Sequence, residues 1–176
     1  MDLYDAIRAS RPCTTFQTRP VPEEKVRAVV AAARLAPSQS NLQPWRFVVV
    51  RDEELKRQVA QACPRGKIVS EAPVVIVAFA LEDDLPMTVG GYISTYPLDT
   101  AVAVHQLRLA AVAEGLATNW IVDFHEDKIR RALQIPEGIH PIAVLPLGFP
   151  AEVNGSAPAE GRKSPDEIIA YDRYPW

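Results

Sequence analysis

The sequence has few of the residues that build disulfide frameworks or metal centres. Its 176 residues include 2 cysteines and 3 histidines, which are scattered along the chain. Cys13 and Cys63 lie far apart and form no Cys-x-x-Cys motif. We therefore expect neither a structural disulfide nor a metal site.

Long apolar runs and an excess of one charge are also missing. No stretch approaches the roughly 20 apolar residues that a membrane-spanning helix needs. The chain begins directly with an amphipathic segment, without the pattern of a targeting leader. Its 19 Lys and Arg residues are interspersed with 22 Asp and Glu residues. Such a surface exerts no long-range attraction on nucleic acid or an anionic membrane. We expect a soluble, cytoplasmic protein with neither of these partners.

The usual signatures of side-chain catalysis are absent as well. The chain shows no Ser-His-Asp set, no paired-carboxylate site, no Walker loop and no Gly-rich dinucleotide fingerprint. An enzyme without a nucleophile, a base or a metal must take its chemistry from a cofactor. Two alternatives stay open: a cofactor-dependent enzyme, or a protein that is not an enzyme.

Apolar periodicity indicates a single domain over residues 1–176, large enough for a real core. It predicts helices over residues 1–9, 22–35, 52–62, 99–114 and 126–133, and strands over 45–50, 74–80, 117–122 and 142–148. Residues 63–67 and 81–98 are expected to be irregular, with a turn at 90–92. In the first helix, Leu3, Ala6 and Ile7 are predicted to face inward. The helix over 99–114 is apolar on most sides, so it should be central and largely buried, with His105 as a core or interface residue.

The segment from Ala36 to Trp45 joins a helix to a strand in an unusual way. Two prolines, Pro37 and Pro44, stiffen its backbone. Between them stand hydroxyl and amide groups that can hold a ligand: those of Ser38, Ser40, Asn41 and Gln43. Alternatively, Ser38 or Ser40 merely caps a short helix that Pro44 ends, and Trp45 is the first core residue of the next strand.

Several short motifs, taken in order, resemble the FMN-dependent nitroreductase family. They are Asp5-Ala6-Ile7-Arg8 with Arg11 to Phe16, Arg19 to Pro22, Ala36 to Trp45, Phe47 to Val50, Ala72-Pro73, Glu114-Gly115-Leu116, Trp120-Ile121, Ile135 to Gly138, Leu147 to Pro150 and Arg162-Lys163. The resemblance implies an α+β fold, with a mixed, mainly antiparallel sheet of four or five strands flanked by helices, in an intertwined homodimer. It also implies a tightly held FMN, with NADH or NADPH as hydride donor and a small-molecule electron acceptor such as a nitroaromatic or a quinone.

By resemblance, the flavin contacts fall on residues from several parts of the chain. They are Ser10, Arg11, Pro12, Pro37, Ser38, Ser40, Asn41, Gln43, Lys67, Val122, Asp123, Arg162 and Lys163. Arg11, Arg162 and Lys163 of one subunit would hold the phosphate, and residues 38–43 of the other subunit would bind the ring or ribityl chain. Lys67 would approach the pyrimidine edge, and backbone groups of Val122 and Asp123 would meet N5 and O4. The family commonly has two or three basic residues around positions 10–14, where this chain has only Arg11.

Simpler interpretations remain open for these positions. Arg11 and Lys67 could be solvated surface charges, and Arg162-Lys163 a basic linker. Residues 151–176 cannot form a core of their own, and their aromatic end is expected to pack on the partner subunit. The resemblance predicts two-electron transfer through FMN with no catalytic side chain. The alternatives are a flavin-binding protein without turnover, in a regulatory or storage role, and a dehalogenating or flavin-fragmenting branch of the same fold.

Overall fold

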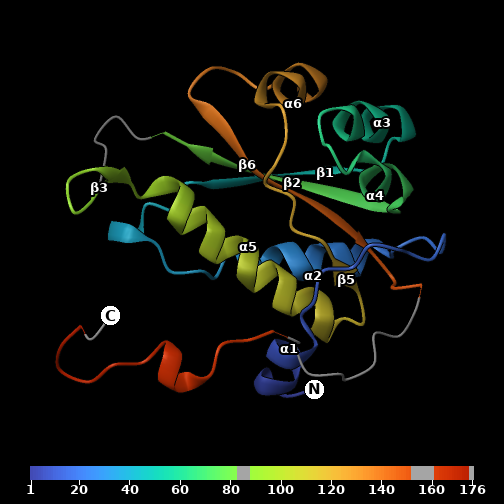
Figure 1. The fold of residues 1–176 in the computed structure, drawn as a ribbon. Coiled ribbons are helices and arrows are strands. Elements are labelled where there is room, and N and C mark those ends of the chain that lie inside the picture. Colours follow the sequence, from blue (N-terminus) through green and yellow to red (C-terminus); the bar gives the residue numbers. More distant parts are fainter. Residues whose placement is uncertain (83–87, 152–160, 175–176) are drawn as a thin grey trace.

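The computed structural model describes residues 1–82, 88–151 and 161–174. A central sheet is covered by helices on both faces (Figure 1). The sheet consists of β1 (Trp45–Val50), β2 (Val74–Leu81), β6 (Ile139–Gly148) and β5 (Ala117–Thr118), in the spatial order β1-β2-β6-β5. All three pairings are antiparallel. The predicted α+β class with a mainly antiparallel sheet is therefore confirmed.

One face of the sheet packs against α2 (Glu23–Ala33) and α5 (Tyr96–Ala113). The core on this side joins Val29 and Leu107 to Ile76 of β2, all three fully buried. Alternate residues of a strand point to opposite faces, so the neighbours of Ile76 serve a second core. Central position explains why β2 is apolar along its whole length.

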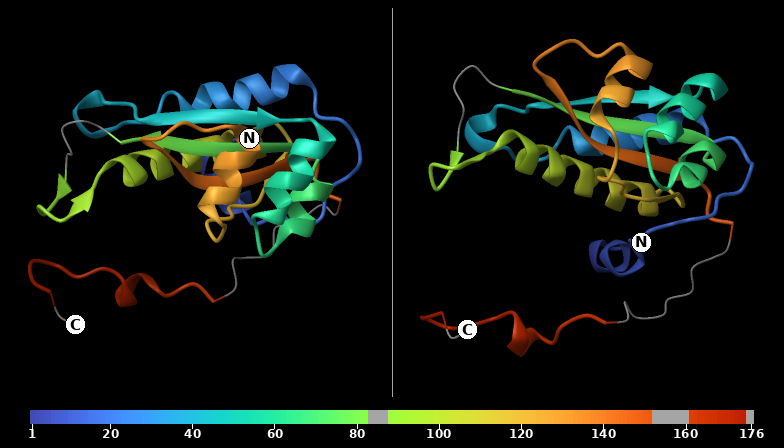
Figure 2. Two further views of the ribbon diagram at one scale, coloured as in Figure 1. Left: turned by 90° about the horizontal axis from the view of Figure 1, so that it is seen from above. Right: turned by 45° about the horizontal axis from the view of Figure 1, so that its top comes forward.

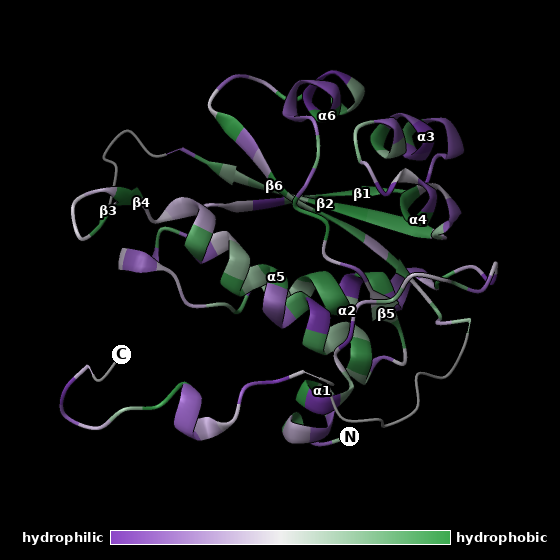
Figure 3. Cartoon of the chain, viewed as in Figure 1, coloured by the Kyte–Doolittle hydropathy of each residue, from purple (hydrophilic) through white to green (hydrophobic). Residues whose placement is uncertain are grey.

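The other face packs against α3 (Glu53–Gln61), α4 (Gly66–Glu71) and α6 (Glu126–Leu133). Val59, Phe79 and Ile129 are buried in its core. Figure 3 shows the strands as largely hydrophobic, whereas α3 and α6 are mostly hydrophilic. These two helices are amphipathic because only one side of each meets the sheet.

The remaining elements lie around this body. The helix α1 (Leu3–Ala9) lies near the C-terminal end of α5, and the hairpin of β3 (Thr88–Val89) and β4 (Ile93–Ser94) precedes α5 (Figure 1). Residues 161–174 contain a single short 3-10 turn, Pro165–Glu167, and run apart from the body in all views (Figures 1 and 2). None of the helices formed by the described residues is long and apolar enough to cross a membrane.

Two predicted boundaries were wrong. Residues 63–67 were expected to be irregular, but α4 begins at Gly66. A side chain at position 66 would collide with the carbonyl group of Ala60, so glycine permits the tight step from α3 to α4. The helix α5 starts at Tyr96, not at Asp99, because Pro97 is compatible with a first helical turn.

The strand predicted over residues 117–122 is broken. Only Ala117–Thr118 pair as β5, and Ile121 adds one isolated bridge to Val144. The residue that Asn119 meets on β6 is Pro146, which has no N–H group to complete the ladder.

The inward orientation predicted for Leu3 and Ile7 was also wrong for a single chain. They are 63% and 49% exposed, and Ala6 is the buried residue of α1. Similarly, α5 buries Ala103 and Leu107, whereas its opposite side is open, with Val102 42% exposed. Both helices thus present apolar side chains outward.

Candidate functional site

The loop between α2 and β1 has an unusual backbone. The φ angle is positive at three of its residues: 48° at Ser40, 58° at Asn41 and 49° at Gln43. Left-handed backbone costs a non-glycine residue roughly 1–2 kcal/mol. Strain of this kind clusters at functional sites, where the surrounding structure enforces it. The segment that the sequence singled out is therefore a preformed and strained loop.

Hydrogen bonds hold this loop in shape. The Gln43 backbone N–H donates to Ser38 Oγ over 2.9 Å, and the Gln43 side-chain amide donates to Asn41 O and Oδ1 over 3.1 Å. A 3-10 helix, Gln39–Asn41, does follow Ser38, but Ser38 makes no capping bond to it. Trp45, which is 5% exposed, does open the next strand. The capping alternative is therefore right about the short helix and wrong about the role of Ser38.

The polar groups of the loop are available to a ligand. Pro37, Ser40, Asn41 and Gln43 are exposed, and Ser38 is half-buried. Gln43 also borders a groove of about 650 Å³ between α2 and β1. The loop thus offers hydroxyl and amide groups without a net charge, which suits the hydrogen-bonding edge of an uncharged ring or polyol.

A second cluster surrounds the segment after α1. The Cys13 N–H donates to the Thr118 carbonyl and Asn119 Nδ2 donates to the Cys13 carbonyl, both over 2.9 Å. These bonds fix Ser10, Arg11 and Pro12 beside the free edge of β5. Ser10 and Arg11 are half-buried there and Pro12 is exposed.

Val122 and Asp123 follow the bridge at Ile121 and are both exposed. Asp123 lies close enough to Cys63 to affect its ionisation. Burial, and secondly the Asp123 charge, raise the pKa of the Cys63 thiol to about 11. The His125 N–H donates to the Ala62 carbonyl over 2.8 Å, so the segment that follows Val122 lies beside the link between α3 and α4.

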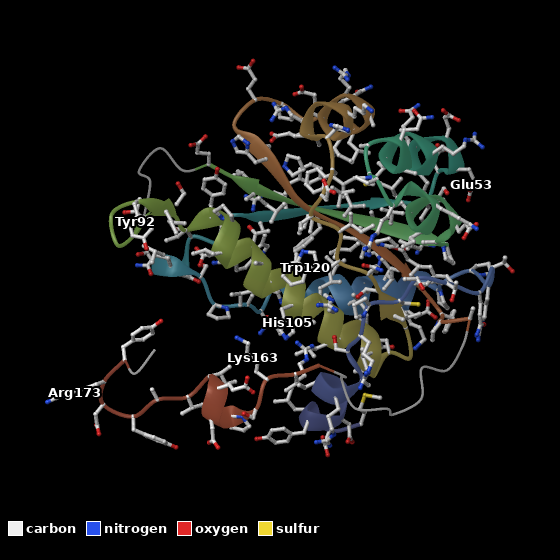
Figure 4. The ribbon with its side chains drawn as sticks, viewed as in Figure 1. Glu53, Tyr92, His105, Trp120, Lys163 and Arg173 are labelled. Carbon is white, nitrogen blue, oxygen red and sulfur yellow. The ribbon has the colours of Figure 1, made fainter. Side chains whose placement is uncertain are left out.

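The three predicted basic residues beyond Arg11 are all on the surface. Lys67 lies on α4, 84% exposed, and meets Glu71 at 3.7 Å. Arg162 and Lys163 are exposed on the tail. Figure 4 shows Lys163 on the side of α5 from which His105 projects, away from the sheet. No group of three or more His, Cys, Asp or Glu within residues 1–82, 88–151 and 161–174 could hold a metal ion.

One chain does not bring its predicted flavin residues together. The loop bonds to Asp99 in the first turn of α5, whereas residues 10–13 lie beside β5, which follows the other end of that helix. The 18 residues of α5 span roughly 27 Å at 1.5 Å per residue. The loop at residues 38–43 and the segment at residues 10–13, two candidate half-sites, therefore lie apart in the described part of the chain.

Two further features near the half-sites were missed in the sequence. Asp99 Oδ1 accepts a hydrogen bond from the Gln39 N–H over 3.2 Å. The Arg108 guanidinium lies 5.5 Å from the Trp120 ring, and burial lowers its pKa. Each of these contacts joins residues from separate elements, so local pattern does not predict it. The signal in the sequence is a charged residue within an otherwise apolar helix.

Comparisons with known proteins agree with this architecture. The profile of the Nitroreductase family matches residues 7–66 and 60–149. A protein of Methanothermobacter thermautotrophicus that carries the name NADH dehydrogenase/NAD(P)H nitroreductase is 34% identical over 160 residues, which cover 89% of this chain and 81% of that protein. A nitroreductase family protein of Clostridium novyi superposes with a TM-score of 0.82 at 32% identity, covering 86% of this chain and 87% of its own. One from Clostridium difficile superposes with a TM-score of 0.89 at 26% identity, covering 99% and 100%.

Other relatives are named for different reactions. A 5,6-dimethylbenzimidazole synthase of Rhodospirillum rubrum is 30% identical over 161 residues, covering 78% of this chain and 76% of that protein. An iodotyrosine deiodinase of Haliscomenobacter hydrossis is 27% identical over 186 residues, covering 86% and 80%. The profile match, the sequence identity and the shared fold agree, and the chain belongs to the Nitroreductase family.

Proposed function

We propose that the protein is an FMN-dependent NAD(P)H oxidoreductase that passes two electrons to a nitroaromatic, a quinone or a related acceptor. The observation that carries this proposal is the strained loop at residues 38–43, with its exposed hydroxyl and amide groups. The family membership of the chain supports a cofactor as the source of chemistry, as does the absence of the usual catalytic motifs from its sequence.

The residues present fit FMN in two parts. Ser38, Ser40, Asn41 and Gln43 would bind the uncharged ring or ribityl chain. Arg11, Arg162 and Lys163 would bind the phosphate through charge-assisted hydrogen bonds. Lys67 would approach the pyrimidine edge of the ring, and the backbone of Val122 and Asp123 would meet its N5 and O4 atoms. When bound, FMN would take a hydride from NADH or NADPH and return two electrons to the acceptor, while the protein binds and orients both partners.

A homodimer completes the site in this proposal. The two candidate half-sites lie toward opposite ends of α5, so a second copy related by a two-fold axis can bring the loop of one chain to Arg11 of the other. The outward apolar side chains of α1 and α5 supply a surface for this contact. Leu3, Ile7, Leu98 and Val102 are between 42% and 63% exposed. Burying such apolar area drives association.

The C-terminal extension, residues 151–176, is proposed to pack on the partner subunit. Ile168, Ile169, Tyr171 and Tyr174 are between 49% and 85% exposed. Truncation after Lys163 is therefore expected to weaken the dimer, as measured by sedimentation across a dilution series. A truncated protein with the same dimer affinity would contradict this part of the proposal.

The main test is an anaerobic reductive titration of purified protein loaded with FMN. We expect flavin absorbance that NADH or NADPH bleaches, and reoxidation by a nitroaromatic, a quinone or, as a test of the dehalogenating branch, an iodinated phenol. Gln43→Ala should weaken FMN binding, whereas the control Gln134→Ala, on a helix end outside the site, should not. Bound flavin that neither nucleotide bleaches would indicate a binding protein without turnover. Failure to take up FMN at micromolar concentration would overturn the proposal.

A further inference from the structure

Asp99 connects the strained loop to the rest of the fold. Its Oδ1 atom accepts the Gln39 N–H over 3.2 Å, a bond between residues 60 positions apart. The bonds from Gln43 to Ser38 and Asn41 stay within the loop. Internal bonds determine the shape of a loop but not its position on the fold. Arg46, at the start of the adjoining strand β1, also donates to the Gln43 carbonyl over 3.3 Å, but it lies only three residues along the chain. Asp99 ties the loop backbone to a distant element, the helix α5.

The second oxygen of the same carboxylate is unusual. Asp99 Oδ2 is buried and has no hydrogen-bond partner among the described residues. Burying an unpaired polar atom is costly. Its place in the first turn of α5 offsets part of this cost, because the positive end of the helix dipole favours a carboxylate. The fold therefore keeps a carboxylate under the loop at a cost in stability.

We propose that Asp99 is the positioning residue that holds the loop at residues 38–43 in its ligand-binding geometry. This inference rests on the proposed function of the loop as an FMN site. Three left-handed residues make the bound shape of the loop energetically unfavourable by itself. Loss of the Asp99 contact releases Gln39 and allows the loop to relax into a shape that binds FMN poorly.

Two substitutions separate the hydrogen bond from the charge. Asp99→Asn keeps an oxygen at nearly the same position and removes the charge, so it should preserve the bond to Gln39. Asp99→Ala removes the acceptor. If the hydrogen bond is what matters, the asparagine variant should keep the wild-type loop geometry and the alanine variant should lose it.

Hydrogen exchange and FMN affinity together provide the test. In the apoprotein, Asp99→Ala should speed exchange of the Gln39 amide about tenfold, and it should weaken FMN binding by about the same factor, as expected for one hydrogen bond. Asp99→Asn should stay within about threefold of wild type in both measurements. FMN affinity is read from the quenching of flavin fluorescence, so it does not depend on turnover.

A matched control comes from Asp52, which accepts the Leu55 N–H over 2.8 Å at the start of α3. Asp52→Ala removes the same kind of bond and should lower stability without changing FMN affinity or Gln39 exchange. If both alanine variants weaken FMN affinity equally, the effect of Asp99→Ala comes from lowered stability alone, and the inference is overturned. Wild-type Gln39 exchange in Asp99→Ala would also overturn it.

The exchange experiment also separates this inference from the proposed function. If the wild type fails to bind FMN, the proposed function fails, while the exchange experiment still decides whether Asp99 positions the loop. If Asp99→Ala does not fold, Asp99→Glu takes its place, because it keeps the charge but displaces the acceptor. Unchanged exchange at Gln39 in that variant would contradict the inference.

Discussion

At the scale of single residues, the left-handed loop conformation predicts a conflict between stability and binding. Ser40 has a φ of 48° and is exposed. Ser40→Gly should raise the stability of the apoprotein by about 0.5 kcal/mol, because glycine adopts this conformation without strain but loses more entropy on folding. The same substitution should weaken FMN binding through loss of the hydroxyl group and of rigidity. Thermal unfolding and flavin titration measure the two effects.

Gln134 provides the control for this prediction. It is also exposed and left-handed, with a φ of 54°, but it ends α6 outside the proposed site. Gln134→Gly should stabilise the protein to a similar degree and leave FMN affinity unchanged. If both glycine variants bind FMN like the wild type, Ser40 does not contribute to the site.

In the apoprotein, the Cys63 thiol should make stability depend on pH at alkaline values. Burial and the nearby Asp123 raise the thiol pKa to about 11, above its ordinary value of 9.0. The unfolded chain therefore loses this proton first, so the contribution to stability is complete below pH 9 and is lost as the pH rises toward 11. Cys63→Ala should show a shallower decline in unfolding free energy over this range. Val69→Ala, which removes buried volume but no titrating group, should keep the wild-type slope.

At the scale of helices, Lys56 connects α3 to the end of α4. Its side chain is 4% exposed, and its amine donates to the Ala72 carbonyl over 2.9 Å and meets Glu53 at 2.8 Å. Figure 4 shows Glu53 at the outer edge of the molecule, so the lysine alone is inside. Lys56→Met leaves the buried carbonyl unpaired and should cost about 1–3 kcal/mol in urea unfolding. Arg57→Met, which breaks an exposed ion pair on the same helix, should have a much smaller effect because solvent screens that pair.

At the scale of the whole molecule, the outward side of α5 predicts the mode of assembly. A charge at Val102, which is 42% exposed in one chain, would be buried in the proposed dimer. Val102→Glu should therefore convert the dimer to monomers, as measured by light scattering, and should weaken FMN binding because the half-sites separate. Val102→Leu keeps the surface apolar and should remain dimeric. If Val102→Glu remains a dimer, the interface does not include this side of α5.

Local pattern predicted much of the fold. The strand over residues 45–50 and the helix over 126–133 have the predicted bounds, because apolar periodicity and terminal residues act within a few positions. The start of α4 and the break in β5 were not predictable in this way. They depend on Gly66 meeting Ala60 and on Asn119 meeting Pro146, which are encounters between separate elements.

By itself, the sequence determined the family, the class of fold and the composition of the loop at residues 36–45, because motif order, periodicity and side-chain chemistry are properties of the chain. Only the tertiary structure decided that Ser40, Asn41 and Gln43 are left-handed, that Asp99 bonds to the loop from 60 residues away, and that the loop and residues 10–13 lie toward opposite ends of α5. Packing brings distant residues together and imposes backbone strain, and neither effect is written in any local pattern.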